Sequence, residues 1–254
     1  MIRIMISGCN GKMGQAVTAI CAAKDDIQVV AGVDISPEKH STYPVYKDPM
    51  EFPGQVDCMI DFSNPIALPA LLNYCKKTGC AAVLATTGYT DAQLQEIAEA
   101  SKTVRIFRSA NMSLGINVLL QIVRQAARIL GDTCDIEIVE KHHNRKLDAP
   151  SGTALMIADA VSSVLPGPSE YIYERHSVQK KRGASEIGIS SVRGGSIVGE
   201  HDILFAGNDE VLEITHTAYS REIFANGAVK AALYLTSQTT PGLYSMEDLV
   251  SEVV

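Results

Sequence analysis

Two adjacent imidazoles followed by a small-residue turn form the part of the sequence best suited to chemistry. His142 and His143 lie in the stretch 140–154, and a histidine side chain ordinarily titrates near pH ~6.5, so either ring could donate a proton. Arg145 and Lys146 add positive charge. The Pro-Ser-Gly-Thr turn at 150–153 is typical of a helix start, where backbone N–H groups and the helix dipole attract anions. These residues together predict a site that binds a small acid and protonates it.

Two other interpretations of this stretch stay open. The first is a solvated basic loop that leads into a capped helix. The second is a metal site, because histidine is a common zinc ligand. No Cys or Glu stands at a zinc-like spacing from His142 and His143, so we expect no metal. The choice between a site and a plain loop depends on the rest of the chain.

The elements that must position this stretch can be predicted from hydrophobic periodicity. A strand over 134–139 leads into it, and a helix over 154–165 follows it. The basic run 175–182 lies in a polar segment that is either solvated or closes over the site. An amphipathic helix over 114–130 precedes this region. Three more strands, predicted at 187–193, 197–205 and 211–217, would complete an open antiparallel or mixed sheet.

A second chemical pattern stands at the N-terminus. The apolar run 2–7 predicts a strand, and Gly8, Gly11 and Gly14 follow it in a GxxGxxG spacing at the start of a predicted helix. Another predicted strand ends at Asp34, twenty residues after Gly14. A strand, a glycine turn, a helix and a second strand with a terminal acid are typical of a dinucleotide-binding unit. Because the spacing is not GxGxxG, a purely structural loop remains the alternative.

Further strands and helices alternate through the first half of the chain, which predicts a parallel, doubly wound sheet. Pro69 should kink its helix or delay its start. A ligand should lie beyond the carboxyl ends of the strands. The expected strands are 57–62, 81–85 and 104–107, and the expected helices are 63–78, 91–101 and, near the end of the chain, 221–237.

Composition narrows the class of protein. The net charge of −7 argues against a nucleic-acid partner, and no apolar run approaches the ~20 residues that cross a bilayer. Six cysteines lie in apolar runs without a CxxC pair, which is typical of reduced thiols. The sequence begins directly with a predicted strand, so we expect no signal peptide. We therefore expect a cytoplasmic protein without a membrane partner.

The chain resembles the 4-hydroxy-tetrahydrodipicolinate reductase family, also called dihydrodipicolinate reductases, of the diaminopimelate route to lysine. The resemblance runs nearly end to end, and its most specific part is the Glu-Lys-His-His stretch with the Lys-Leu-Asp-Ala-Pro-Ser-Gly-Thr-Ala run. The matching blocks are 8–14, 61–63, 86–88, 109–113, 140–143, 146–154, 199–201, 213–216, 221, 224–228 and the tail from 242.

The resemblance implies a fold and an assembly. An N-terminal Rossmann-type, doubly wound parallel sheet, residues 1–113 with 219–254, would bind the dinucleotide. A central α+β domain with an open mixed sheet, residues 114–218, would carry substrate and subunit contacts in a homotetramer. The implied reaction is the NAD(P)H-dependent reduction of a dehydrated cyclic imine dicarboxylate to tetrahydrodipicolinate.

The resemblance also implies roles for individual residues. His142 would be the proton donor and Lys146 the second catalytic group. His143, Gly152 and Thr153 would bind the substrate carboxylate. Cofactor contacts would come from Gly8, Cys9, Asn10, Gly11, Lys12, Met13, Asp34, Ala85, Thr86, Thr87, Ser109, Ala110, Asn111 and Met112.

The chain departs from the family pattern at two positions. Ala85 stands where a glycine is common, and Ile35 follows Asp34 where some members have an arginine. A carboxylate repels the 2′-phosphate of NADPH, so Asp34 with Ile35 favours NADH, although Lys39 could reach that phosphate.

Several interpretations remain beside this one. Another NAD(P)-linked dehydrogenase of similar build would need a different central constellation, and a non-catalytic cofactor sensor would have a degraded second site. His201 and His216 are interpreted as structural or interface groups. Arg193 and Arg221 could contact substrate or form ion pairs.

Overall fold

The computed structural model describes residues 1–36, 38 and 41–252. The chain forms two compact units, Met1–Leu114 together with Arg221–Val254, and Gly115–Ser220. Lys39, considered above for cofactor choice, lies outside the described residues.

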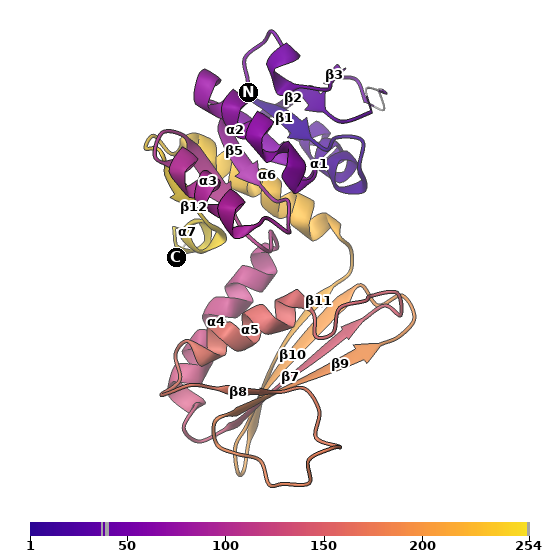
Figure 1. The fold of residues 1–254 in the computed structure, drawn as a ribbon. Helices are drawn as coiled ribbons and strands as arrows, with labels where there is room; N and C mark the ends of the chain where they lie inside the picture. Colours follow the sequence, from indigo (N-terminus) through magenta and orange to yellow (C-terminus); the bar gives the residue numbers. More distant parts are fainter. Residues whose placement is uncertain (37, 39–40, 253–254) are drawn as a thin grey trace. The chain divides into compact units, whose positions relative to one another are not determined.

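The first unit is built on a parallel sheet of seven strands in the order β12-β6-β5-β4-β1-β2-β3 (Figure 1). Every strand pair in it is parallel, and the non-sequential order requires helical crossovers. The strands are β1 (Ile2–Ser7), β2 (Ile27–Val33), β3 (Val45–Tyr46), β4 (Cys58–Asp61), β5 (Ala81–Leu84), β6 (Arg105–Arg108) and β12 (Gly242–Tyr244).

Helices cover both faces of this sheet. Along β1, Ile4 and Ile6 pack in one core with helices α1 and α6, whereas Met5 packs in the opposite core with α2 and α3. Since both faces are buried, the strand interiors are runs of apolar residues instead of alternating, and the charged residues Arg3, Asp61 and Arg105 lie at or near strand ends. The helices are α1 (Lys12–Ala22), α2 (Leu68–Thr78), α3 (Asp91–Ser101), α6 (Glu222–Ser237) and the short α7 (Met246–Ser251), with 3-10 turns at Pro49–Glu51 and Pro65–Ala67.

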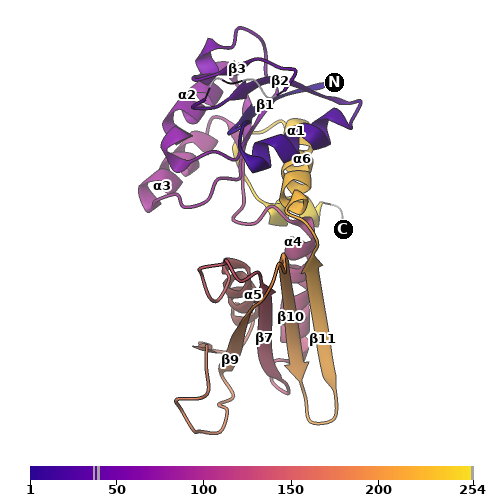
Figure 2. The same ribbon diagram turned by 90° about the vertical axis from the view of Figure 1, so that its right-hand side faces the viewer.

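The second unit contains a five-stranded mixed sheet in the order β11-β10-β7-β9-β8. Strand β7 pairs antiparallel with β10 and parallel with β9. Helices α4 and α5 lie on one side of this sheet (Figure 2), and they share a core with its isoleucines and Phe205. The elements are α4 (Leu114–Leu130), β7 (Asp135–His142), α5 (Gly152–Ser162), β8 (Glu170–Ile172), β9 (Glu186–Arg193), β10 (Gly199–Ala206) and β11 (Val211–Ala218).

The predicted fold class, a Rossmann-type parallel sheet with a separate mixed sheet, is confirmed. Helices α3 and α4 have the predicted bounds, whereas α5 begins two residues earlier than expected. Pro69 delays the start of α2, because a 3-10 turn occupies Pro65–Ala67 and places the proline in the first helical turn. The strands β3, β8 and β12 and helix α7 were not predicted, and all four are short edge or terminal elements.

Close packing of α6 against the loop that follows β6 gives a test of the first unit. A Cβ atom at Gly227 would lie 1.6 Å from the carbonyl oxygen of Met112. We expect Gly227→Ala to lower the free energy of unfolding by about 1–3 kcal/mol, because the helix must shift away from that carbonyl. Thermal unfolding measures this, with Lys230→Ala on the exposed side of α6 as control. Equal melting temperatures for the two variants would contradict the packing described.

Candidate functional site

The glycine turn after β1 has a conformation that side chains would disturb. Gly8 has φ +76°, and a Cβ atom there would lie 2.7 Å from the carbonyl oxygen of Phe62. A Cβ atom at Gly14 would lie 2.2 Å from the carbonyl oxygen of Gly8. Gly11 is the N-cap of α1 and makes no side-chain cap bond. This start of α1 therefore matches the anion-binding turn of a dinucleotide fold.

Asp34 is fixed beside this turn. It follows β2 directly, and its carboxylate accepts hydrogen bonds from the backbone N–H groups of Asn10 (3.0 Å) and Ser36 (3.2 Å). A cavity of about 480 Å³ is lined by Gly8, Asn10, Asp34 and the exposed Ile35, among others. An oriented carboxylate in a cavity beside a helix N-terminus fits the ribose and pyrophosphate of a dinucleotide.

The other predicted cofactor residues lie on the same edge of the sheet, after β5 and β6, where all carboxyl ends meet. Thr86 is buried and donates to Asp61 Oδ2 (2.7 Å), so its side chain anchors the loop. Thr87 and Ala110 are exposed, whereas Asn111 and Met112 are buried. The carboxamide oxygen of Asn111 accepts from the N–H of Ser113 (2.9 Å). Backbone groups and exposed side chains of these loops are therefore the available ligand contacts.

Cys9, Lys12 and Met13 complete the predicted cofactor set. Burial, assisted by the charge of Asp34, raises the pKa of the Cys9 thiol to about 11, so this thiol is neutral. Lys12 is exposed and Met13 half-buried in the first turn of α1. Among these three residues, Lys12 alone can place a charge near a bound phosphate.

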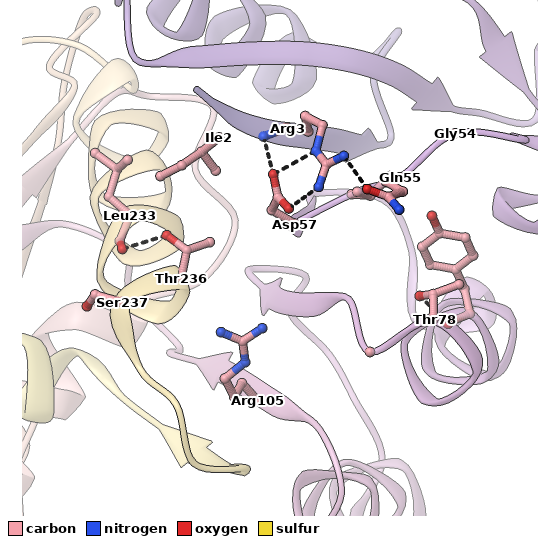
Figure 3. Close-up of a pocket in the computed structure, with 13 residues that line it drawn as sticks. Ile2, Arg3, Gly54, Gln55, Asp57, Thr78, Arg105, Leu233, Thr236 and Ser237 are labelled. Carbon is pink, nitrogen blue, oxygen red and sulfur yellow. Dashed lines mark hydrogen bonds and ion pairs between the residues drawn. The ribbon is translucent and has the colours of Figure 1, made fainter.

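A larger cavity, of about 720 Å³, lies at the opposite edge of the same sheet, where the strands begin (Figure 3). Its two arginines already have partners within the protein. Arg3 is bound by Asp57 (2.6 Å) and Gln55 (2.6 Å), and Arg105 donates to the carbonyl oxygen of Gln238 (2.8 Å) after α6. Ligands of open α/β sheets bind beyond the carboxyl ends of the strands, so we do not assign the functional site to this cavity.

In the second unit, one face of the mixed sheet changes from apolar to polar. On β7, Ile136 and Ile138 face the helices, and the period of two continues with Glu140 and His142. On β10, His201 pairs in register with Glu140 and lies beyond Ile203 on the same face. The apolar part of the face builds the core, and the polar part collects titratable groups at the ends of the strands.

Glu140 lies at the centre of this polar cluster and has no exposed surface. Its two oxygens accept from both terminal nitrogens of Arg193 (2.7 and 2.8 Å), from His142 Nδ1 (2.6 Å) and from the N–H of Ser151 (3.1 Å). Burial, the largest influence, would raise the pKa of Glu140. The hydrogen bonds from Arg193, Ser191 and His142 together outweigh it and lower that pKa to about 2. Glu140 is therefore a carboxylate at neutral pH.

His201 is a second buried imidazole in the cluster. Its Nε2 lies 3.0 Å from Ser151 Oγ, and its ring stands edge-on to the ring of His142 at 5.3 Å. Burial, with the charge of His142 next, lowers the pKa of His201 to about 4, so this ring is neutral at neutral pH. The interpretation of His201 as a structural group agrees with these contacts.

The turn into α5 joins the cluster through Ser151. The predicted helix cap is present, because Ser151 Oγ accepts from the N–H of Ala154 (3.1 Å). Gly152 and Thr153 then form the first turn of α5, and Gly152 is exposed with open space where a Cβ atom would stand. This turn can receive an anion without a side chain in the way.

The remaining predicted site residues lie in the loop between β7 and α5. The N–H of Lys146 donates to the carbonyl oxygen of His143 (3.1 Å), and the ammonium of Lys146 pairs with Asp148 (2.9 Å), whose carboxylate is largely exposed. The hydrogen bond from Lys146 lowers the pKa of Asp148. The structure thus joins His142 to Glu140, Arg193 and His201, whereas Lys146 is held by Asp148.

Several residues of the polar cluster around Glu140 were not assigned a role from the sequence. The period-two pattern of 136–142 places Glu140 on the same face as His142, and that signal was available. Arg193 forms an ion pair with Glu140, which is one of the two roles that the sequence left open for it. In the basic run 175–182, the exposed Arg175 and Lys180 pair with Glu186, and the half-buried Arg182 pairs with Asp135.

Within residues 1–36, 38 and 41–252, no group of three His, Cys, Asp or Glu side chains gathers in a way that could hold a metal ion. No described helix is both long enough and apolar enough to span a bilayer.

Comparison with known proteins identifies the relatives of this chain. Residues 2–112 match the family described as "Dihydrodipicolinate reductase, N-terminus", and residues 115–250 match "Dihydrodipicolinate reductase, C-terminus". The chain is 53% identical over 252 residues to 4-hydroxy-tetrahydrodipicolinate reductase of Caldanaerobacter subterraneus subsp. tengcongensis, covering 99% of each chain. It is 46% identical over 250 residues to the enzyme of that name from Clostridium botulinum, covering 98% of each.

Solved structures agree with the sequence matches. The dipicolinate-bound dihydrodipicolinate reductase from Paenisporosarcina sp. TG-14 superposes with a TM-score of 0.84 at 27% identity, over 98% of this chain and 99% of that one. Aspartate dehydrogenase from Thermotoga maritima has a TM-score of 0.53 at 11% identity, over 95% of this chain and 100% of that one. That second likeness shows a shared fold alone.

The neutral, buried His201 predicts how stability depends on pH. Its folded pKa, about 4, lies below the ordinary value of 6.5, so the unfolded chain binds the proton more readily. The stability that depends on neutral His201 is present above pH 6.5 and is lost as the pH falls toward about 4. We expect His201→Gln to reduce this pH-dependent loss in the free energy of unfolding, by about 3 kcal/mol at most. Urea unfolding measured between pH 6.5 and about 4 tests this.

The matched control for this pH measurement is His176→Gln, which replaces an exposed histidine in the same unit. It should keep the pH dependence of the unaltered chain. Parallel curves for His201→Gln and the unaltered chain would show that His201 is not held neutral by burial.

Proposed function

The chain belongs to the dihydrodipicolinate reductase family, and we propose that it reduces 4-hydroxy-tetrahydrodipicolinate, through its dehydrated cyclic imine dicarboxylate, to tetrahydrodipicolinate with NAD(P)H. One observation carries the proposal. The full-length match includes an intact polar cluster in which His142 is bound to a buried carboxylate beside the start of α5. A non-catalytic sensor would have no need to keep such a cluster.

The first unit would hold the cofactor, whose chemistry is to supply a hydride. The glycine turn and the start of α1 would bind the pyrophosphate, and Asp34 would accept hydrogen bonds from the adenosine ribose. The loops after β5 and β6 would complete the site. The assigned cofactor residues are Gly8, Cys9, Asn10, Gly11, Lys12, Met13, Asp34, Ala85, Thr86, Thr87, Ser109, Ala110, Asn111 and Met112.

His142 would supply the proton of the reduction. Hydride addition to a conjugated imine leaves electron density on the substrate, and a general acid must protonate it. The ring of His142 is held by Glu140 at Nδ1 and is only partly buried, so it can be oriented and still reach a ligand. Lys146 would be the second catalytic group, released from the exposed Asp148 when an acidic substrate binds.

The start of α5 would bind a substrate carboxylate. Gly152 and Thr153 lie in its first turn, where the helix dipole is positive, and His143 and Lys146 lie in the loop that precedes it. The ligand would thus be a small molecule with two carboxylates, one of which must reach this turn. This agrees with the dicarboxylate substrate class of the family.

Assembly and location are part of the same proposal. An apolar cavity of about 520 Å³ lies beside the edge strand β11, lined by Ile122, Ile129, Leu212 and Ile214. Exposed apolar surface at a sheet edge supports burial against another copy of the chain. We therefore propose a homotetramer, and we propose that it works in the cytoplasm.

The catalytic assignment is tested by substitution of the two assigned groups. We expect His142→Gln and Lys146→Ala each to lower kcat by roughly 10²–10⁴-fold, because proton transfer in the transition state is lost. NADH binding, measured by fluorescence, should be unchanged, because the cofactor residues lie in the other unit. Turnover is followed as the loss of reduced-nicotinamide absorbance, with substrate made in place by the synthase from pyruvate and aspartate semialdehyde.

The control for this pair is His176→Gln, which should turn over like the unaltered enzyme. Full turnover by His142→Gln would remove His142 from the mechanism. An unaltered chain that binds NADH and NADPH but turns over neither would instead favour a cofactor sensor.

The cofactor preference is tested at Asp34. We expect a higher kcat/KM with NADH than with NADPH, because the carboxylate would face the 2′-phosphate. Asp34→Ser should raise the NADPH-to-NADH ratio of kcat/KM about tenfold, since one repulsive charge near the phosphate is removed. Asp25→Ser, which removes an exposed carboxylate between α1 and β2, is the control for net charge. A large NADPH advantage in the unaltered enzyme would overturn the preference.

A further inference from the structure

The geometry points to Glu140 as a positioning residue that fixes the orientation and tautomer of His142, so that the ring delivers its proton from Nε2 alone. Gly199 also contributes to this arrangement, because it leaves the Nε2 side of the His142 ring open. This inference rests on the proposed role of His142 as the general acid.

Hydrogen bonds from separate elements hold the Glu140 carboxylate in one position. His142 Nδ1 and one terminal nitrogen of Arg193 donate to Oε2, and the N–H of Ser151 and the other terminal nitrogen of Arg193 donate to Oε1. The donors come from β7, β9 and the start of α5, so the carboxylate cannot rotate without breaking contacts to separate elements. A ring bound to this carboxylate takes its orientation from the sheet itself.

The charge of Arg193 decides which way the proton can move. Glu140 is paired bidentately with Arg193 and stays ionised, so it accepts a hydrogen bond from His142 without taking the proton. The Nδ1 atom of His142 must then carry hydrogen in both the neutral and the charged ring. The proton that passes to the substrate leaves from Nε2, the electron pair of that N–H bond stays on the ring, and solvent reprotonates the atom afterwards.

The surroundings of Nε2 agree with this direction. A Cβ atom at Gly199 would lie 3.1 Å from His142 Nε2, which is closer than ordinary van der Waals contact. Any side chain there would crowd the atom that must meet the substrate. The other groups that face the ring are Arg193 on β9 and His201 on β10, and burial keeps His201 uncharged. Glu140 is thus the anion that the imidazolium contacts directly.

The competing explanation is that Glu140 serves the fold alone, as the buried partner of Arg193. A matched pair in the same unit separates the two explanations. Glu186 is also buried and is bound by Arg175 (2.7 Å) at the other end of β9. Glu186→Gln should cost stability as Glu140→Gln does, because each replaces a buried carboxylate that is paired with cations, which at Glu186 are Arg175 and Lys180.

We therefore compare kinetics and unfolding for Glu140→Gln and Glu186→Gln in the full chain. Glu140→Gln should lower kcat roughly a hundredfold with a smaller change in KM, since a misplaced ring loses transition-state contact. The alkaline limb of its pH–activity profile should also move to lower pH, because a neutral amide favours the imidazolium less than a carboxylate does. Glu140→Asp should recover part of kcat. Glu186→Gln should keep the unaltered kcat and pH profile.

Two measurements do not depend on the stability of Glu140→Gln. Nitrogen-15 NMR of the unaltered chain, with His142 assigned by the signal missing in His142→Gln, should show the Nδ1–H tautomer of the neutral ring. Gly199→Ala should lower kcat at least tenfold while Glu140 keeps its hydrogen bonds. The Nε2–H tautomer in the unaltered chain, or equal kcat and pH profiles for Glu140→Gln and Glu186→Gln, would overturn the inference.

Failure of this inference and failure of the proposed function give different results. If His142→Gln turns over normally, the assignment of the acid fails, and the role of Glu140 fails with it. If His142→Gln is inactive while Glu140→Gln behaves like Glu186→Gln, the reductase mechanism stands and Glu140 is only structural.

Discussion

The stability of the second unit depends on one buried carboxylate and on the groups that must bind it. Glu140 is fully buried, and a charge in that position is tolerated only because Arg193, His142 and Ser151 satisfy it. Removing one partner of such a group leaves an uncompensated charge, which typically costs 3–5 kcal/mol. The same contacts tie β7 to β9 and to the start of α5. Stability and the orientation of the His142 ring therefore have a common physical origin.

Both units place their polar groups where strands end and a helix begins. In the first unit the glycine turn and Asp34 follow β1 and β2, and α1 starts beside them. In the second unit Glu140 and His142 end β7, and α5 starts close by. Strand interiors must be apolar because their faces are buried, so the polar and titratable side chains lie at the strand ends. There the unsatisfied N–H groups of a helix also attract anions.

The long elements were predictable because their periodicity extends over several turns or residue pairs. Helix α4 has the predicted bounds, and the βαβ unit with its terminal Asp34 was evident from spacing. Elements such as β3 and β12, of two and three residues, are too short for any pattern to repeat. They exist because a neighbouring strand offers them hydrogen bonds, which is a tertiary cause.

The sequence by itself determined the residue types of both sites and the order of the strands and helices around them. The tertiary structure alone continued β7 to His142, three residues beyond the predicted end, and so placed Glu140 and His142 on one face of a strand. Only the tertiary structure decided that Arg193 meets Glu140 across 53 residues and that His201 meets Ser151 across 50. It also decided that Lys146 rests on Asp148. Periodicity reports the face of one element, whereas ion pairs between distant strands follow from the order and register of a sheet, which no local pattern encodes.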